Sequence, residues 1–328
     1  MKRVIGLTIL LISTYVLEFL LLYEGNIVDE VGFYESPAEI SVTNTTINKE
    51  SIQHYYKVVK QLEEINFESL DQAIVMNEEI IKRNYIKSID PIVNEINVNL
   101  LFHNFNNFRE SNNGVKGIYI NGYYMNQETK INHIKEILTK TNVNTLVIDA
   151  KTDNGHIMFD SKSSQSDLLK NERVKYDAQT LAELREIKDI YLIARIVVFQ
   201  DPLFAKTFKE EAIFDSKNNK IYSQNGQYFL DPSSEVVKEY IINIAIESCK
   251  LGFNEIQFDY IRYPDSNYEY MVFKEKSDYE TRVNNINSFL EEAKTRLHLE
   301  GCLVSADIFG YILTNTEDGG IGQNLETI

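Results

Sequence analysis

Three aspartates occur late in short segments that are rich in apolar residues, where their carboxyl groups could do acid–base chemistry. Asp259 lies 110 positions after Asp149, and Asp307 lies 48 positions after Asp259. Two carboxyl groups on one face suit the hydrolysis of a glycosidic bond, because one donates a proton to the leaving oxygen while the other attacks or activates water. The sequence therefore predicts Asp259, Asp307 and Asp149 as catalytic residues.

Further polar residues surround these aspartates in the sequence. Arg195 lies inside an otherwise apolar segment, and a buried arginine needs a partner because an unpaired buried charge is very unfavourable. Arg195 or Arg262 beside a carboxylate would stabilise its charged form, whereas a carboxyl group in an apolar pocket would keep its proton. A structural ion pair remains the alternative for both arginines. The predicted substrate-binding residues are Lys151, Asp153, Arg195, Gln257, Tyr260 and Arg262.

The elements that must position these residues alternate between strands and helices from residue 114 onwards. Apolar strands covered by helices on a parallel sheet fit both a β/α barrel and an open doubly wound sheet. In a barrel the carboxyl ends of the strands carry the chemistry. No G-x-G-x-x-G pattern follows the first strand, which disfavours a nucleotide-binding sheet. Strands are predicted at 117–122, 145–151, 191–199, 255–263 and 303–310, and helices at 128–140, 177–188, 233–250 and 275–298.

Composition excludes some classes of partner. The formal net charge is -16, from 49 acidic and 33 basic residues, and nucleic-acid affinity comes largely from lysine and arginine contacts to phosphate. No nucleic-acid partner is therefore expected. The only two cysteines, Cys249 and Cys302, are predicted to be buried thiols without a disulfide. No cofactor or metal is predicted, with Ca²⁺ or Mg²⁺ among the strand-end carboxylates as an alternative.

The amino-terminal segment has the pattern of a targeting element. Lys2 and Arg3 precede an apolar run over residues 4–23, close to the roughly 20 residues of a membrane helix. We expect a signal anchor, or alternatively a cleaved signal peptide, over residues 1–24. The remainder would then lie outside the cell, on the membrane or secreted. A spacer and a helical region are expected over residues 25–112.

Five ordered blocks resemble a known family: residues 116–119, 146–155, 193–202, 252–264, and 305–310 with 321–323. They resemble bacterial proteins of glycoside-hydrolase type with a TIM-barrel domain, catalogued as a domain of unknown function. The resemblance implies an exported barrel domain over residues 113–328 that hydrolyses carbohydrate. The block containing Asp259 is also similar to the strand of alpha-amylase-type barrels that ends in the nucleophile, although Gln257 stands where those enzymes have arginine.

A TIM barrel has eight strands, and about five are predicted here. The expected fold is therefore an α/β barrel that is incomplete at its carboxyl end. The expected function is hydrolysis of a poly- or oligosaccharide at the cell surface by paired-carboxylate chemistry. The alternatives are a non-catalytic carbohydrate-binding or cell-wall-associated protein on the same scaffold, and a structural surface protein that acts through residues 48–112.

Overall fold

The computed structural model describes residues 40–42, 45–47, 91–162, 169, 175–265, 268–315 and 318–328. The chain divides into two units, Met1–Ile65 and Asn66–Ile328. The first contains an antiparallel pair of strands, β1 (Ile40–Val42) and β2 (Thr45–Ile47). The predicted anchor at residues 1–24 lies outside the described residues. No helix in the described part of the chain is both long enough and apolar enough to cross a membrane.

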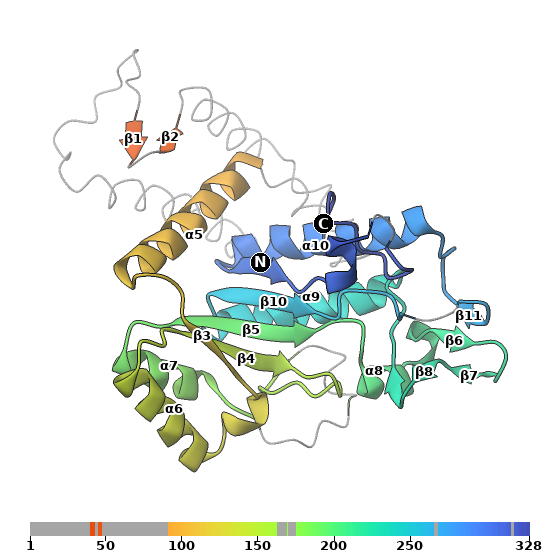
Figure 1. Cartoon of the computed structure of the whole chain (residues 1–328), viewed down its shortest axis with the longest axis horizontal. Coiled ribbons are helices and arrows are strands. Elements are labelled where there is room, and N and C mark those ends of the chain that lie inside the picture. Colours follow the sequence, from red (N-terminus) through yellow and green to blue (C-terminus); the bar gives the residue numbers. More distant parts are fainter. Residues whose placement is uncertain are drawn as a thin grey trace, which may run out of the picture. The chain divides into compact units, whose positions relative to one another are not determined.

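The second unit is built on a parallel sheet of five strands that neighbour one another in chain order (Figure 1). A doubly wound sheet reverses its strand order at a switch point, whereas the strands of a β/α barrel follow one another around the sheet. The observed order is therefore that of consecutive strands of a TIM-type barrel. The strands are β3 (Gly117–Ile120), β4 (Thr145–Lys151), β5 (Tyr191–Val197), β10 (Glu255–Asp259) and β12 (Leu303–Ala306).

Four helices connect these strands, at nearly the predicted positions. A polar residue immediately precedes each of these helices. For example, the side chain of Ser234 accepts a hydrogen bond from Val237 N at the start of its helix. The helices are α6 (Glu128–Lys140), α7 (Ala178–Ile187), α9 (Glu235–Lys250) and α10 (Tyr279–Leu299). The predicted helical region before the sheet is represented among the described residues by α5 (Pro91–Ser111).

The two faces of the sheet differ in chemistry. One face is apolar and packed against the helices, and six of its side chains are fully buried: Leu146, Ile148, Ala194, Ile196, Ile256 and Phe258. Successive residues of a strand point to opposite faces, so the intervening positions share the other face. That face carries Arg195 and Gln257, which are partly exposed. The face that bears Arg195 and Gln257 is therefore less apolar than the face packed against the helices.

Short elements extend from the carboxyl ends of the strands. In Figure 1 the small sheet of β6, β7 and β11 lies beyond the arrowhead of β5. These short elements lie at the end of the sheet where the charged residues gather. They comprise η1 (Gly122–Tyr124), α8 (Pro202–Thr207), η3 (Lys209–Glu211), β6 (Phe214–Asp215), β7 (Lys220–Ile221), β8 (Ser223–Gln224), β9 (Gln227–Tyr228), β11 (Met271–Val272) and η4 (Gly310–Leu313).

The two cysteines form a disulfide, which corrects the prediction of free thiols. Cys249 lies in the last turn of α9 and Cys302 immediately precedes β12, with 6.0 Å between their Cα atoms. Both residues are buried, as predicted. The pairing of β10 with β12 brings the start of β12 beside the end of α9, a proximity that the separation of 53 residues conceals in the sequence.

Candidate active site

A polar row crosses the sheet on its partly exposed face. In the strand register, Asp149 on β4 is opposite Arg195 on β5, and Arg195 is opposite Gln257 on β10. Gln257 is in turn opposite Ser305 on β12. Registered residues of neighbouring strands point to the same face, so residues far apart in the sequence become direct neighbours here.

Arg195 joins two of the predicted catalytic carboxylates. Its Nη1 lies 2.7 Å from Asp149 Oδ1, while its Nε and Nη2 lie 3.0 and 2.5 Å from Asp259 Oδ2. Burial acts to lower the pKa of the guanidinium, but the hydrogen bonds and charges of Asp149 and Asp259 outweigh it and raise the pKa. Arg195 is therefore a permanent cation between two acids, and its predicted need for a partner is confirmed.

Asp149 is almost completely enclosed by donors. Its Oδ2 accepts hydrogen bonds from Tyr119 OH at 2.5 Å and from Gly122 N at 3.4 Å, and the residue is only 2% exposed. Desolvation of the Tyr119 hydroxyl, together with its bond to Asp149, raises the pKa of Tyr119, so the phenol remains a donor. With its oxygens occupied, Asp149 fits the task of orienting Arg195. Tyr119 was not among the predicted site residues, because it carries no charge that would distinguish it in the sequence from a core aromatic residue.

Asp259 ends β10 and is more accessible. Its side chain is 22% exposed, and its Oδ1 accepts a hydrogen bond from Tyr260 N at 2.7 Å. Tyr260 has a φ of 53°, in the left-handed region that few residues other than glycine adopt. Strained backbone of this kind concentrates at functional sites. The turn at Tyr260 ends the strand, so the Asp259 carboxylate lies at the carboxyl end of the sheet, where it pairs with Arg195.

Asp307 follows β12 and has a different environment. Gln257 Nε2 donates to Asp307 Oδ1 at 2.7 Å, and the backbone N–H of Asp307 donates to Phe258 O. Burial raises the pKa of the Asp307 carboxyl group; the hydrogen bond from Gln257 and the charge of Arg195 lower it, and the charge of Asp259 raises it. The net pKa lies above the ordinary value, so Asp307 retains its proton at a higher pH than a typical aspartate.

Tyr260 and Arg262 form the rim beside these carboxyl groups. The guanidinium carbon of Arg262 lies 5.4 Å from the ring centre of Tyr260 and 5.2 Å from that of Phe309. Its Nη1 donates to Tyr263 O at 3.2 Å. The two rings and this bond fix the arginine at the carboxyl end of the sheet, next to Asp259 and Asp307. Phe309 was not among the predicted site residues.

Lys151 lies away from the acidic cluster, which corrects its predicted contact with substrate. The β4–β5 register shifts between Asp149 and Lys151, so Lys151 is opposite Ile196 and points to the helix-covered face. Its side chain is fully buried and pairs with Asp201 Oδ2 at 3.0 Å. Asp153 is partly exposed, and its charge helps to raise the pKa of Tyr119, which places it near the edge of the cluster.

The glycine-rich segment near residue 320 supports the loops that carry Asp259 and Asp307. Gln323, which is 1% exposed, donates from Nε2 to Ile261 O at 3.2 Å and accepts at Oε1 from Phe309 N at 2.8 Å. Asp318 accepts from Gly322 N at 2.7 Å and pairs with Arg282. The buried residues of this segment therefore hold the loops after β10 and β12 against each other.

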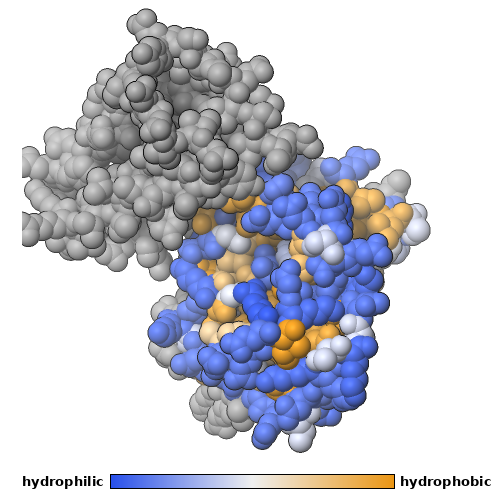
Figure 2. Space-filling view, turned by 90° about the vertical axis from the view of Figure 1, so that its left-hand side faces the viewer, coloured by the Kyte–Doolittle hydropathy of each residue, from blue (hydrophilic) through white to orange (hydrophobic). Residues whose placement is uncertain are grey.

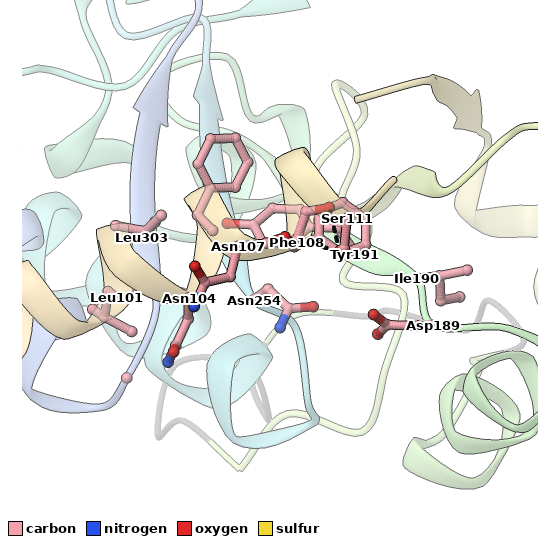
Figure 3. A pocket seen from close by; sticks show the side chains of 12 residues that line it. Leu101, Asn104, Asn107, Phe108, Ser111, Asp189, Ile190, Tyr191, Asn254 and Leu303 are labelled. Atoms are coloured by element: carbon pink, nitrogen blue, oxygen red, sulfur yellow. Dashed lines mark hydrogen bonds between the residues drawn. The ribbon is translucent and has the colours of Figure 1, made fainter. Parts of the chain in front are cut away.

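A pocket lies at the opposite end of the sheet from the acidic cluster. It has a volume of about 480 Å³ and lies between α5 and the amino-terminal ends of β5, β10 and β12 (Figure 3). Its lining includes Asn104, Phe108, Tyr191, Asn254 and Leu303, and none of the predicted catalytic residues. Figure 2 views this end, where the described surface is hydrophilic with apolar patches. Among the described residues, no three acidic, histidine or cysteine side chains are grouped as a metal site.

Comparisons with known proteins agree with this geometry. Residues 117–328 match a protein family described as "Putative glycosyl hydrolase domain". The crystal structure of a hypothetical protein from Ruminiclostridium thermocellum ATCC 27405 is 32% identical, covering 60% of this chain and 99% of that chain, with a TM-score of 0.52. No curated protein sequence matches the chain.

Two glycoside hydrolases are more distantly similar. The chitobiase of Flavobacterium johnsoniae is 15% identical, covering 59% of this chain and 31% of that chain, with a TM-score of 0.44. The PgaB (BpsB) glycoside hydrolase domain from Bordetella bronchiseptica is 10% identical, covering 65% of this chain and 71% of that chain, with a TM-score of 0.46. Likeness at this level does not identify a substrate.

Proposed function

The chain belongs to the family described as "Putative glycosyl hydrolase domain", and we propose that it hydrolyses glycosidic bonds in a poly- or oligosaccharide. Asp307 is the proton donor to the leaving oxygen, and Asp259 is the second carboxylate, acting at the anomeric carbon or on water. The observation that carries the proposal is the contrast between two neighbouring carboxyl groups. Asp259 is ion-paired with Arg195, while burial raises the pKa of Asp307.

This contrast supplies the two roles that the reaction needs. A glycosidase requires one carboxyl group that is protonated and one that is charged. This difference in protonation arises from different surroundings of the two groups. Arg195 binds Asp259 through Nε and Nη2, and Asp149 orients Arg195 from the other side through Nη1. We therefore assign Asp149 as a positioning residue, in place of the catalytic role expected from the sequence.

We further propose that the protein works outside the cytoplasm. The Cys249–Cys302 disulfide supports this location, because structural disulfides form and persist in oxidising compartments. The apolar run at residues 4–23 after Lys2 and Arg3 supports attachment to, or passage through, the membrane. Labelling of intact cells with a membrane-impermeant reagent tests this location; labelling only after lysis would oppose it.

The acid role of Asp307 is tested by varying the leaving group. Asp307→Ala should lower kcat by about 10²- to 10⁴-fold on glycosides with poor leaving groups. The loss should be much smaller for dinitrophenyl glycosides, whose leaving group departs without a proton. Asp160→Asn serves as the control, since the Asp160 side chain is 87% exposed and lies outside the cluster. Equal losses on both substrate types would refute the assignment.

The same experiment separates catalysis from binding alone. If the parent protein binds the polysaccharide but releases no product, and Asp307→Ala binds it equally well, the non-catalytic carbohydrate-binding alternative is favoured. Turnover by the parent that depends on Asp307 would support the hydrolase.

A further inference from the structure

The side-chain amide of Gln257 is only half satisfied. Its Nε2 donates to Asp307 Oδ1 at 2.7 Å, but its Oε1 is buried and has no hydrogen-bond partner among the described residues. Buried polar atoms are almost always paired, so an unpaired acceptor next to a candidate catalytic acid needs an explanation. Asp307 is the neighbouring side chain that the same amide already contacts.

The partner that fits is Asp307 in its protonated form. A carboxylate only accepts hydrogen bonds, whereas a carboxylic acid also donates one. The side-chain amide of glutamine carries a donor, Nε2, and an acceptor, Oε1. A rotation of 180° about the Cγ–Cδ bond exchanges their positions. After that half-turn, Gln257 would present Oε1 to the hydroxyl group of Asp307, at the position where Nε2 now lies.

We propose that Gln257 is a positioning residue that holds Asp307 in both protonation states, donating from Nε2 to the carboxylate and, after a half-turn of its amide, accepting at Oε1 from the carboxylic acid. The inference rests on the proposed function, in which Asp307 gives up and regains a proton in every turnover. In each orientation the amide makes one hydrogen bond to Asp307 and leaves its other polar atom unpaired. The number of hydrogen bonds is therefore the same for both protonation states of Asp307.

Other side chains at this position would favour one state. A lysine or arginine could only donate hydrogen bonds and would stabilise only the carboxylate form of Asp307. A glutamate would add a further negative charge beside Asp259 and Asp307. The charged and titratable groups that act on Asp307 are Asp259 from β10 and Arg195 from β5. Gln257 lies in register between Arg195 and Ser305, so its backbone is fixed while its amide turns.

The direct test is neutron diffraction from deuterium-exchanged crystals of the parent protein at two pH values. The values are chosen on either side of the Asp307 midpoint, measured by NMR of ¹³C-labelled aspartate carboxyl groups with Asp307→Asn as the assignment control. Above the midpoint, the amide deuterons of Gln257 should face Asp307. Below it, Asp307 should carry a deuteron directed at Gln257 Oε1.

Gln323 is the matched control in the same crystals. Backbone groups bind both ends of its amide, Ile261 O at Nε2 and Phe309 N at Oε1, so its orientation should be the same at both pH values. A single orientation of Gln257 at both pH values would overturn the proposal. The diffraction result needs no turnover, so absence of hydrolysis would refute the proposed function and leave this test valid.

Kinetics supply a second readout. Gln257→Met keeps the length of the side chain but removes the hydrogen bond to Asp307 in either protonation state, and it should lower kcat about tenfold with KM changed less than about twofold. A kcat equal to that of the parent would contradict a positioning role. A rise in KM alone would indicate that Gln257 acts on substrate binding, which would also contradict it.

Discussion

At the scale of residues, Asp259 and Asp307 show how surroundings divide one side-chain chemistry into two roles. Asp259 meets the guanidinium of Arg195, while Asp307 meets a neutral amide in a desolvated position. These surroundings also affect the stability of the folded protein. Ionisation of Asp307 lowers this stability, and removal of Arg195 would leave the buried carboxylate of Asp149 without its ion-pair partner.

Asp307→Asn is predicted to stabilise the folded protein at pH values above the raised folded pKa of Asp307, while removing activity. The folded pKa of Asp307 is raised, so the stability that its proton provides is complete below the unfolded value, about 3.9, and is lost as pH rises through the folded value. Thermal unfolding should therefore show a higher Tm for the variant at pH 8 and no difference at pH 3. A lower Tm at pH 8 would show that the carboxylate is not destabilising.

Arg195→Met is predicted to destabilise the protein by about 3–5 kcal/mol, because it leaves the buried carboxylate of Asp149 without its partner. Urea unfolding measures the loss. The double variant Asp149→Asn/Arg195→Met removes the stranded charge and should recover a large part of it. If the double variant is no more stable than Arg195→Met, the stability depends on packing of Arg195 and not on the ion pair.

Much of this cluster could be predicted from residue types, and the exceptions have physical causes. Arg195 inside an apolar strand required acidic partners, and Asp149 and Asp259 were the available ones. Lys151 could not be placed, because the register shift after Asp149 turns it to the opposite face. Tyr119 gave no signal, since the sequence does not show that its hydroxyl reaches Asp149.

At the scale of elements, the positions of the loops after β10 and β12 depend on the segment around Gly322. Its φ is 78°, and an added Cβ would lie 2.9 Å from Arg282 O and 3.0 Å from Tyr263 Cδ2. The neighbouring Gln323 holds the loops after β10 and β12 together. This element therefore sets the relative position of the candidate acid and its partner carboxylate.

Gly322→Ala is predicted to destabilise the protein by about 1–2 kcal/mol more than Gly226→Ala, and to lower kcat several-fold. Gly226 is the matched control, because its φ is 81° but an added Cβ would meet no atom of the described residues within 4 Å. Urea unfolding of both variants isolates the effect of crowding from that of backbone strain. Equal losses of stability would contradict the role assigned to the close contacts of Gly322.

Element boundaries were largely predictable for α6 and β4, where apolar periodicity is strong and polar residues mark the ends. β10 and β12 end earlier than predicted. The apolar patterns continue through Ile261 and Ile308, but the left-handed turn at Tyr260 and the loop after Ala306 stop the strands. Such backbone turns are set by tertiary contacts that hydrophobic pattern does not record.

At the scale of the whole molecule, a disulfide ties α9 to the start of β12. Closing a loop of 53 residues should contribute about 4 kcal/mol in the chain-entropy model. The Cys249→Ser/Cys302→Ser variant is therefore predicted to unfold at a clearly lower urea concentration than the oxidised parent. The reduced parent should resemble the variant; identical midpoints for all three proteins would show that the disulfide adds no stability.

The central claim is that Asp259 and Asp307 form the catalytic pair of a hydrolase. The most direct measurement is the release of reducing ends from a panel of poly- and oligosaccharides by the parent and by Asp259→Asn, with the Tm of each protein recorded alongside. We predict release by the parent and loss of at least about 10³-fold in the variant at an unchanged fold. Release by Asp259→Asn at the parent rate would contradict the claim.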